Sequence, residues 1–139
     1  PVLLKLAPGL GLPNGLSLPH LSHDPEVIRA YQRDPLVHDK ISARLLQSML
    51  NAMQECHRQA ASLQVPVLLL IAGADKLVDP QGSEAYAAAA PSGFLQVRRY
   101  EAAFHEILNE PLPNPVWADM RQWLNQLPLQ TTLSQRQRA

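Results

Sequence analysis

Two stretches of the sequence decide the fold: VPVLLLIAGADKLVDP at residues 65–80 and LQVRRYEAAFHEILNEP at residues 95–111. Each begins with a short apolar segment, and the first of these is an unbroken apolar run. Such a run is too short for a helix of its own and predicts a strand buried on both faces, as in parallel sheets. Each strand leads into a loop with one candidate catalytic side chain, Asp75 in the first and His105 in the second.

The residues between these segments predict a βαβ unit. We expect strands over 65–73 and 95–101, joined by an alanine-rich helix that begins at Pro80 with Asp79 as its N-cap. A strand, a helix and a strand with short loops form a right-handed crossover, which makes the two strands parallel neighbours. The expected fold class is therefore α/β.

Three further helices are expected after residue 23. A short one over 25–32 follows Asp24 as its N-cap, and another over 114–127 carries an apolar stripe. The clearest helix spans 41–63, where apolar residues recur at three- and four-residue spacing. Cys56 lies on the apolar face of this helix, which predicts a small buried side chain there.

The first 23 residues are rich in proline, glycine and leucine. We expect a short helix over 1–7 and irregular structure after it, because proline and glycine interrupt regular patterns. The leucines make this segment apolar for a loop and predict that it covers another part of the protein. The chain opens in an apolar run, which favours a start within a larger protein, and residues 128–139 are expected to form a flexible polar tail.

Length and composition bound the class of protein. Of the 139 residues, 46% are hydrophobic and 17% are charged, which is typical of one globular domain. Twelve basic and twelve acidic residues cancel, and no basic patch is interleaved with aromatic residues, so nucleic acid is not an expected partner. The single cysteine excludes an internal disulfide and a cysteine-based zinc cluster. His20, His23, His38 and His57 show no metal-ligand spacing with one another or with nearby carboxylates, so no histidine-based metal site is expected.

The candidate catalytic residues follow the carboxyl ends of the two strands, where functional groups of an open α/β sheet gather. Asp75 and His105 are therefore expected at the same edge. There the carboxylate can accept a hydrogen bond from the imidazole Nδ1–H, as in Ser-His-Asp hydrolases. Spacing alone leaves other interpretations open. Asp75 can be a turn residue and His105 a half-buried loop residue, and Asp79 is a competing carboxylate that helix capping explains better.

The nucleophile of such a triad is missing. No Gly-x-Ser-x-Gly motif occurs in the 139 residues. Neither Ser17 nor Ser83 follows a buried strand or enters a helix through paired glycines, as a nucleophile elbow requires. The sequence therefore contains a candidate acid and a candidate base without their serine.

Three separated motifs resemble one known family in order and spacing. They are the two stretches quoted above and the upstream segment LPNGLSLPHLSHDPEVIRAYQRDPLVHDKISARL at 12–45. They are similar to the C-terminal half of bacterial monoacylglycerol lipases and lysophospholipases of the α/β-hydrolase superfamily, and the similarity covers about residues 6–126. The resemblance implies a cap or lid segment at 1–40, followed at 41–127 by the C-terminal part of the α/β-hydrolase core.

The resemblance also implies roles and partners. Asp75 would be the triad acid and His105 the general base of an enzyme that cleaves an ester through an acyl-serine intermediate, without metal or cofactor. The implied substrate is a lipid-like ester of the monoacylglycerol or lysophospholipid type. The implied location is the cytoplasm, with peripheral membrane contact through the cap. The family's serine elbow and oxyanion-hole loop precede the residues present here, so the chain alone is expected to be inactive and to need the missing N-terminal half.

Two alternative interpretations stay open at this point. The chain can be a truncated, non-catalytic domain that associates with a second copy or another partner, because strand 65–73 would lack a neighbour on one edge. It can also belong to an α/β-hydrolase of different chemistry, such as a haloperoxidase or a C–C hydrolase, which shares the Asp and His. The apolar cap favours a lipid-like ester.

Overall fold

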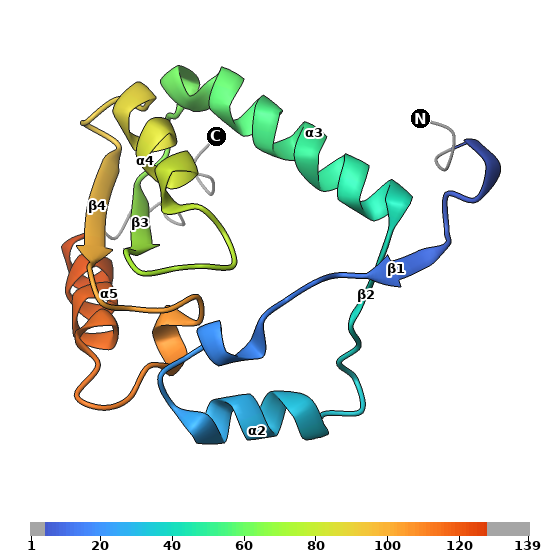
Figure 1. Cartoon of the computed structure of the whole chain (residues 1–139). Coiled ribbons are helices and arrows are strands. Elements are labelled where there is room, and N and C mark those ends of the chain that lie inside the picture. The colour runs from blue at the N-terminus through green and yellow to red at the C-terminus, as the bar shows by residue number, and fades with distance from the viewer. Residues whose placement is uncertain (1–4, 128–139) are drawn as a thin grey trace, which may run out of the picture.

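The computed structural model describes residues 5–127, and Figure 1 shows the arrangement of their elements. The first part of the chain contains strand β1 (Gly11–Pro13), helix α2 (Pro25–Arg33) and strand β2 (Lys40–Ser42). The second part contains α3 (Ala43–Gln59), β3 (Val67–Ala72), α4 (Pro80–Ala89), β4 (Leu95–Tyr100) and α5 (Pro115–Gln126). The start of the helix expected at 1–7 and the tail expected at 128–139 lie outside the described residues.

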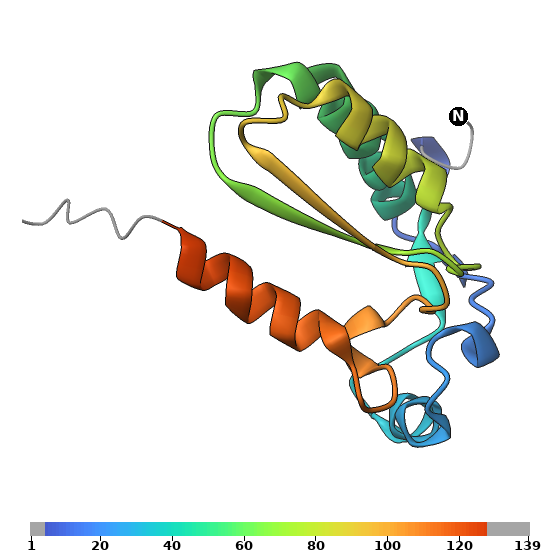
Figure 2. The same cartoon turned by 90° about the vertical axis from the view of Figure 1, so that its left-hand side faces the viewer.

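A parallel pair of strands forms the centre of the second part, as predicted. β3 and β4 pair in register from Val67 with Leu95 to Ala72 with Tyr100. Helices α3 and α4 lie on one side of this sheet and α5 lies on the other (Figure 2). Both α4 and α5 contact β3. The strand–helix–strand–helix order expected of this part of an α/β sheet is therefore present.

Three helices begin at the predicted capping residues. The side chains of Asp24, Asp79 and Asn114 each accept a hydrogen bond from the backbone N–H two residues later. Proline occupies the first position of each of these helices, where an N–H has no helical partner in any case. No helix among residues 5–127 combines the length and the apolar composition that crossing a membrane requires.

The structure differs from the prediction at the start of the long helix. Ile41, predicted to open its apolar face, lies in β2 and pairs with Leu12 of β1. The helix begins after Ser42, whose side chain accepts a hydrogen bond from the backbone N–H of Leu45. The segment predicted to be irregular after residue 7 thus contains a short antiparallel strand. A pairing of three-residue strands from distant segments has too little periodicity to be seen in the sequence.

Burial in β3 and α3 is lower than the sequence predicts. Only Ile71 and Ala72 of β3 are buried. Cys56, predicted to be buried, is exposed. The apolar face of α3 is 46–52% exposed at Leu45, Leu46, Met49, Leu50 and Met53. Periodicity shows which face of an element is apolar, whereas burial also needs a partner. Among the described residues, no strand pairs with the second edge of β3.

The first part of the chain meets the second in two places (Figure 1). α3 runs from β2 back towards β3, and residues 20–23 lie against the loop that follows β4. Leu21 and Ser22 are buried at the second of these contacts. The predicted covering role of the leucine-rich segment is thus confirmed at Leu21, whereas Leu10, Leu12 and Leu16 are exposed.

Candidate active site

The carboxyl ends of β3 and β4 approach closely because a glycine follows β3. A Cβ atom on Gly73 would lie 2.7 Å from the Cα of Glu101, a distance that real Cβ atoms essentially never show. Without a side chain, Gly73 donates its N–H to the carbonyl of Tyr100 at 2.8 Å. The pairing continues into the loops, where Ala74 donates its N–H to the carbonyl of Ala103 at 3.0 Å. The two loops therefore leave the sheet side by side.

Asp75 and His105 meet at this edge, as the sequence predicts. The Nδ1 of His105 lies 2.8 Å from the Oδ2 of Asp75. The other carboxylate oxygen accepts hydrogen bonds from the backbone N–H groups of Leu77 at 2.8 Å and Val78 at 3.0 Å, which fixes its orientation. The Asp75 side chain is 10% exposed and that of His105 is 38% exposed. The pair is therefore held by the protein yet open to a reacting group.

The electrostatic balance at Asp75 favours the carboxylate. Burial raises the pKa of Asp75, but hydrogen bonds from His105 and from the backbone N–H groups of Val78 and Leu77 outweigh it, and the pKa lies below its ordinary value. An ionised carboxylate only accepts hydrogen bonds, so it holds the imidazole proton on Nδ1. Among residues 5–127, no hydrogen bond engages Nε2 of His105. This nitrogen can therefore accept a proton.

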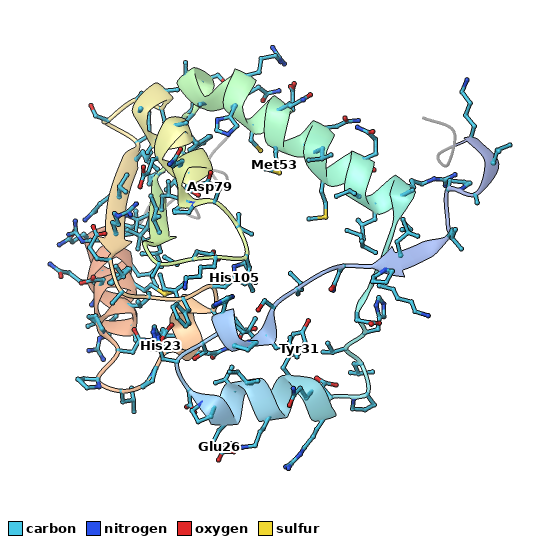
Figure 3. All side chains as sticks on the ribbon, viewed as in Figure 1. His23, Glu26, Tyr31, Met53, Asp79 and His105 are labelled. Carbon is cyan, nitrogen blue, oxygen red and sulfur yellow. The ribbon has the colours of Figure 1, made fainter. Side chains whose placement is uncertain are left out.

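Asp79, the competing carboxylate, is turned to α4. Its Oδ1 accepts a hydrogen bond from the backbone N–H of Gln81 at 2.9 Å and caps the helix. In Figure 3 Asp79 lies beside α4, and His105 lies apart from it. The structure thus assigns the imidazole contact to Asp75 and the cap to Asp79, as the sequence predicts.

A second set of contacts at His105 was not visible in the sequence. Residues 20–23, which we call the strap, lie on the loop 104–110. The backbone N–H of Glu106 donates to the carbonyl of Leu21 at 2.8 Å, and the hydroxyl of Ser22 donates to the carbonyl of Asn109 at 2.8 Å. The partners in the second bond are 87 residues apart, and no local pattern links them.

Two histidines of the strap surround Phe104, the residue before His105. The ring of His23 stacks on that of Phe104 with 3.7 Å between centroids, and His20 packs edge-on against it. The Nδ1 of His23 lies 2.9 Å from the Oε2 of Glu110. Within residues 5–127, no group of three His, Cys, Asp or Glu side chains is arranged to hold a metal ion.

The two serines weighed in the sequence do not join the pair. Ser83 lies within α4, Ser17 precedes the turn Leu18–His20, and neither is hydrogen-bonded to His105. An open pocket of about 430 Å³ lies beside the loop 104–110, but neither Asp75 nor His105 lines it. The described residues thus provide a candidate acid and base without a nucleophile at hydrogen-bonding distance.

Known proteins match most of the chain. The model of the serine aminopeptidase S33 family matches residues 1–112. The monoacylglycerol lipase of Mycolicibacterium smegmatis is 34% identical over 124 residues, which are 88% of this chain and 44% of that protein. Phospholipase YtpA of Bacillus subtilis is 33% identical over 122 residues, covering 87% of this chain and 47% of the other. The crystal structure of Paleococcus ferrophilus monoacylglycerol lipase superposes with a TM-score of 0.82 at 35% identity, covering 88% of this chain and 48% of that one.

These matches confirm the predicted resemblance and fold class. The chain spans about half the length of the relatives it matches. Its parallel sheet and flanking helices correspond to part of the α/β-hydrolase fold of these lipases. The chain belongs to the serine aminopeptidase S33 family of α/β-hydrolases, where it resembles the monoacylglycerol lipases.

Proposed function

We propose that this chain supplies the acid and the base of a Ser-His-Asp triad in a carboxylic ester hydrolase. Asp75 is the acid, His105 is the general base, and the substrates are esters of the monoacylglycerol or lysophospholipid type. The hydrogen bond of 2.8 Å between these two side chains, at the carboxyl edge of a parallel sheet, carries the proposal. The names of the relatives, which are lipases and a phospholipase, support the substrate class.

In the proposed reaction the Nε2 of His105 takes the proton of a serine hydroxyl while the serine oxygen attacks the ester carbonyl. Asp75 keeps the other imidazole proton on Nδ1 and stabilises the imidazolium. The tetrahedral intermediate then expels the alcohol, to which His105 returns the proton, and an acyl-serine remains. Water activated by the same imidazole releases the fatty acid. The fixed carboxylate and an Nε2 that accepts no hydrogen bond from residues 5–127 suit both steps.

The serine and the oxyanion-hole donors lie outside these 139 residues in this proposal, since the sequence contains no Gly-x-Ser-x-Gly motif. Without the serine no acyl-enzyme forms, and each missing oxyanion donor costs about 10²–10³ in kcat. We therefore propose that the chain alone is inactive and becomes active when joined to an N-terminal portion that carries the serine.

The proposal assigns residues 1–40 to the cap and 41–127 to the core. The exposed leucines at 10, 12 and 16 suit contact with an acyl chain or with a membrane surface. Met53 lies on the side of α3 that faces the strap and the loop 104–110 (Figure 3). This exposed apolar face suits contact with the serine-bearing portion, because apolar surface is stabilised by burial.

The test joins this chain to the serine-bearing N-terminal portion of the Mycolicibacterium smegmatis monoacylglycerol lipase. Hydrolysis of 1-oleoylglycerol and of lysophosphatidylcholine is measured for the joined protein, for the 139 residues alone and for a joined His105→Ala variant. We expect hydrolysis by the first only. Hydrolysis that survives His105→Ala would show that the chain does not supply the base.

The second candidate function is a non-catalytic domain that associates through its exposed apolar surfaces. The open edge of β3 and the exposed face of α3 favour it. A stable assembly of the chain with itself, together with no hydrolysis after a folded serine-bearing portion is supplied, would support this candidate over the enzyme.

A further inference from the structure

We propose that Glu110 is a positioning residue for His105 and that it binds the strap, residues 20–23, to the loop that carries this histidine. The inference rests on the proposed function, because it assigns a role beside the same base. It starts from a carboxylate that is 12% exposed and whose two oxygens reach two separate segments of the chain.

The contacts of Glu110 join these segments at the residue before His105. Its Oε1 accepts a hydrogen bond from the backbone N–H of Phe104 at 2.7 Å. Its Oε2 lies 2.9 Å from the Nδ1 of His23 and accepts the backbone N–H of the same residue at 3.4 Å. A carboxylate accepts at both oxygens and forms stronger hydrogen bonds than a neutral group. Glu110 therefore holds the peptide that leads into His105 and, at the same time, the end of the strap.

The backbone of His105 itself is held weakly, so its neighbours set its position. The N–H of His105 reaches the carbonyl of His20 only at 3.5 Å, the limit of a hydrogen bond. On one side Glu106 donates to Leu21 at 2.8 Å, and on the other Phe104 donates to Glu110 at 2.7 Å. Loss of the second bond would release the peptide before His105, and with it the direction of the imidazole towards Asp75.

The strap is attached through the same two residues. The ring of His23 stacks on Phe104 and its Nδ1 faces Glu110, so the contact between cap and core is made beside the general base. Glu101 offers a matched comparison, because it is also a carboxylate close to His105 in the sequence. Its side chain is 77% exposed, and among residues 5–127 it bonds only to the side chain of Arg99.

The experiment uses the chain joined to its serine-bearing portion and measures kcat and KM on a short-chain p-nitrophenyl ester. Glu110→Ala should lower kcat about 10²-fold, the effect of a misplaced catalytic group, with KM within about twofold. Glu110→Gln keeps an acceptor for the N–H of Phe104, so its kcat should be at least about tenfold higher than that of Glu110→Ala. Glu101→Ala should stay within about twofold of the parent. An unchanged kcat in Glu110→Ala would overturn the proposal. It would also be overturned if Glu110→Gln lost as much kcat and as much thermal stability as Glu110→Ala.

A second measurement separates this inference from the proposed function. In the 15N-labelled 139-residue chain, the low-field proton resonance on Nδ1 of His105, assigned with His105→Ala, reports the bond to Asp75. It should persist in Glu101→Ala and shift or disappear in Glu110→Ala. If the joined protein is inactive, the proposed function fails, and this resonance still decides the role of Glu110. A signal unchanged by Glu110→Ala would refute the positioning role.

If the Ala variant does not fold, Glu110→Asp replaces it, since the shorter side chain withdraws the carboxylate from Phe104.

Discussion

The Nδ1 of His105 lies 2.8 Å from the Oδ2 of Asp75, although thirty residues separate them in the chain. The parallel pairing of β3 and β4 brings the two loops to one edge, and Gly73 allows the strand ends to approach. The carboxylate is then oriented by two backbone N–H groups of its own loop. The geometry of an acid and a base is therefore built by a glycine, a strand register and a turn.

Replacement of the triad acid should affect catalysis far more than replacement of the neighbouring carboxylate. In the joined protein, Asp75→Asn should lower kcat about 10⁴-fold, because an amide in this position favours the wrong imidazole tautomer. Asp79→Asn is the control, since asparagine caps a helix about as well as aspartate, and kcat should stay within a few-fold. A larger fall in kcat for Asp79→Asn than for Asp75→Asn would show that Asp75 is not the triad acid.

The 139-residue chain by itself should show no hydrolysis of short acyl esters above the buffer background. The sequence contains no Gly-x-Ser-x-Gly motif, and in the proposed function the serine and the backbone donors to the tetrahedral oxyanion lie outside these 139 residues. Release of p-nitrophenol from the purified chain provides the measurement. Activity that disappears in Ser17→Ala would instead identify Ser17 as a nucleophile.

Acid should remove a stabilising contribution of Asp75. Its pKa is lower in the folded protein than its ordinary value, so the ionised carboxylate stabilises the fold at neutral pH. This contribution is fully present above the unfolded value of about 4 and is lost as the pH falls through the lower folded value. Urea midpoints of the parent and of Asp75→Asn should therefore converge from pH 7 to pH 3. A constant or widening difference would contradict this linkage.

Gly73 should tolerate no side chain. Gly73→Ala places a Cβ against the backbone of Glu101, which cannot move without disturbing β4, and should lower the free energy of unfolding by about 1–3 kcal/mol. Gly82 is the control, because it lies in α4 with open space around it, and Gly82→Ala should raise stability by about 0.5–1 kcal/mol. Urea denaturation of both variants tests the pair, and equal effects would exclude a special role of Gly73.

The chain should not occur as a free monomer at micromolar concentration. The second edge of β3 has no partner among the described residues, and the apolar face of α3 is half exposed. Unpaired edges recruit further strands, so we expect either a complex with the N-terminal portion or a symmetric dimer near residues 65–73. Sedimentation velocity measures the mass. A single species of 15.4 kDa would show that these surfaces are stable in water.

Local sequence predicted the elements that depend on neighbouring residues. The capping side chains Asp24, Asp79 and Asn114, each followed by proline, start their helices where expected. The short apolar runs form the two parallel strands, and Asp75 and His105 follow their ends. These features were predictable because a cap, a turn and an apolar strand each leave a signal within a few residues.

Features that join distant segments were not predictable in this way. Three features depend on which surfaces meet in the folded chain. They are the pairing of β1 with β2, the exposure of Cys56 and the contact of the strap with the loop 104–110. The sequence by itself determined the starts of α2, α4 and α5, the parallel strands and the identities of the candidate acid and base. Only the tertiary structure decided that Glu110 bridges Phe104 and His23, because that carboxylate acquires its partners through contacts between segments far apart in the chain.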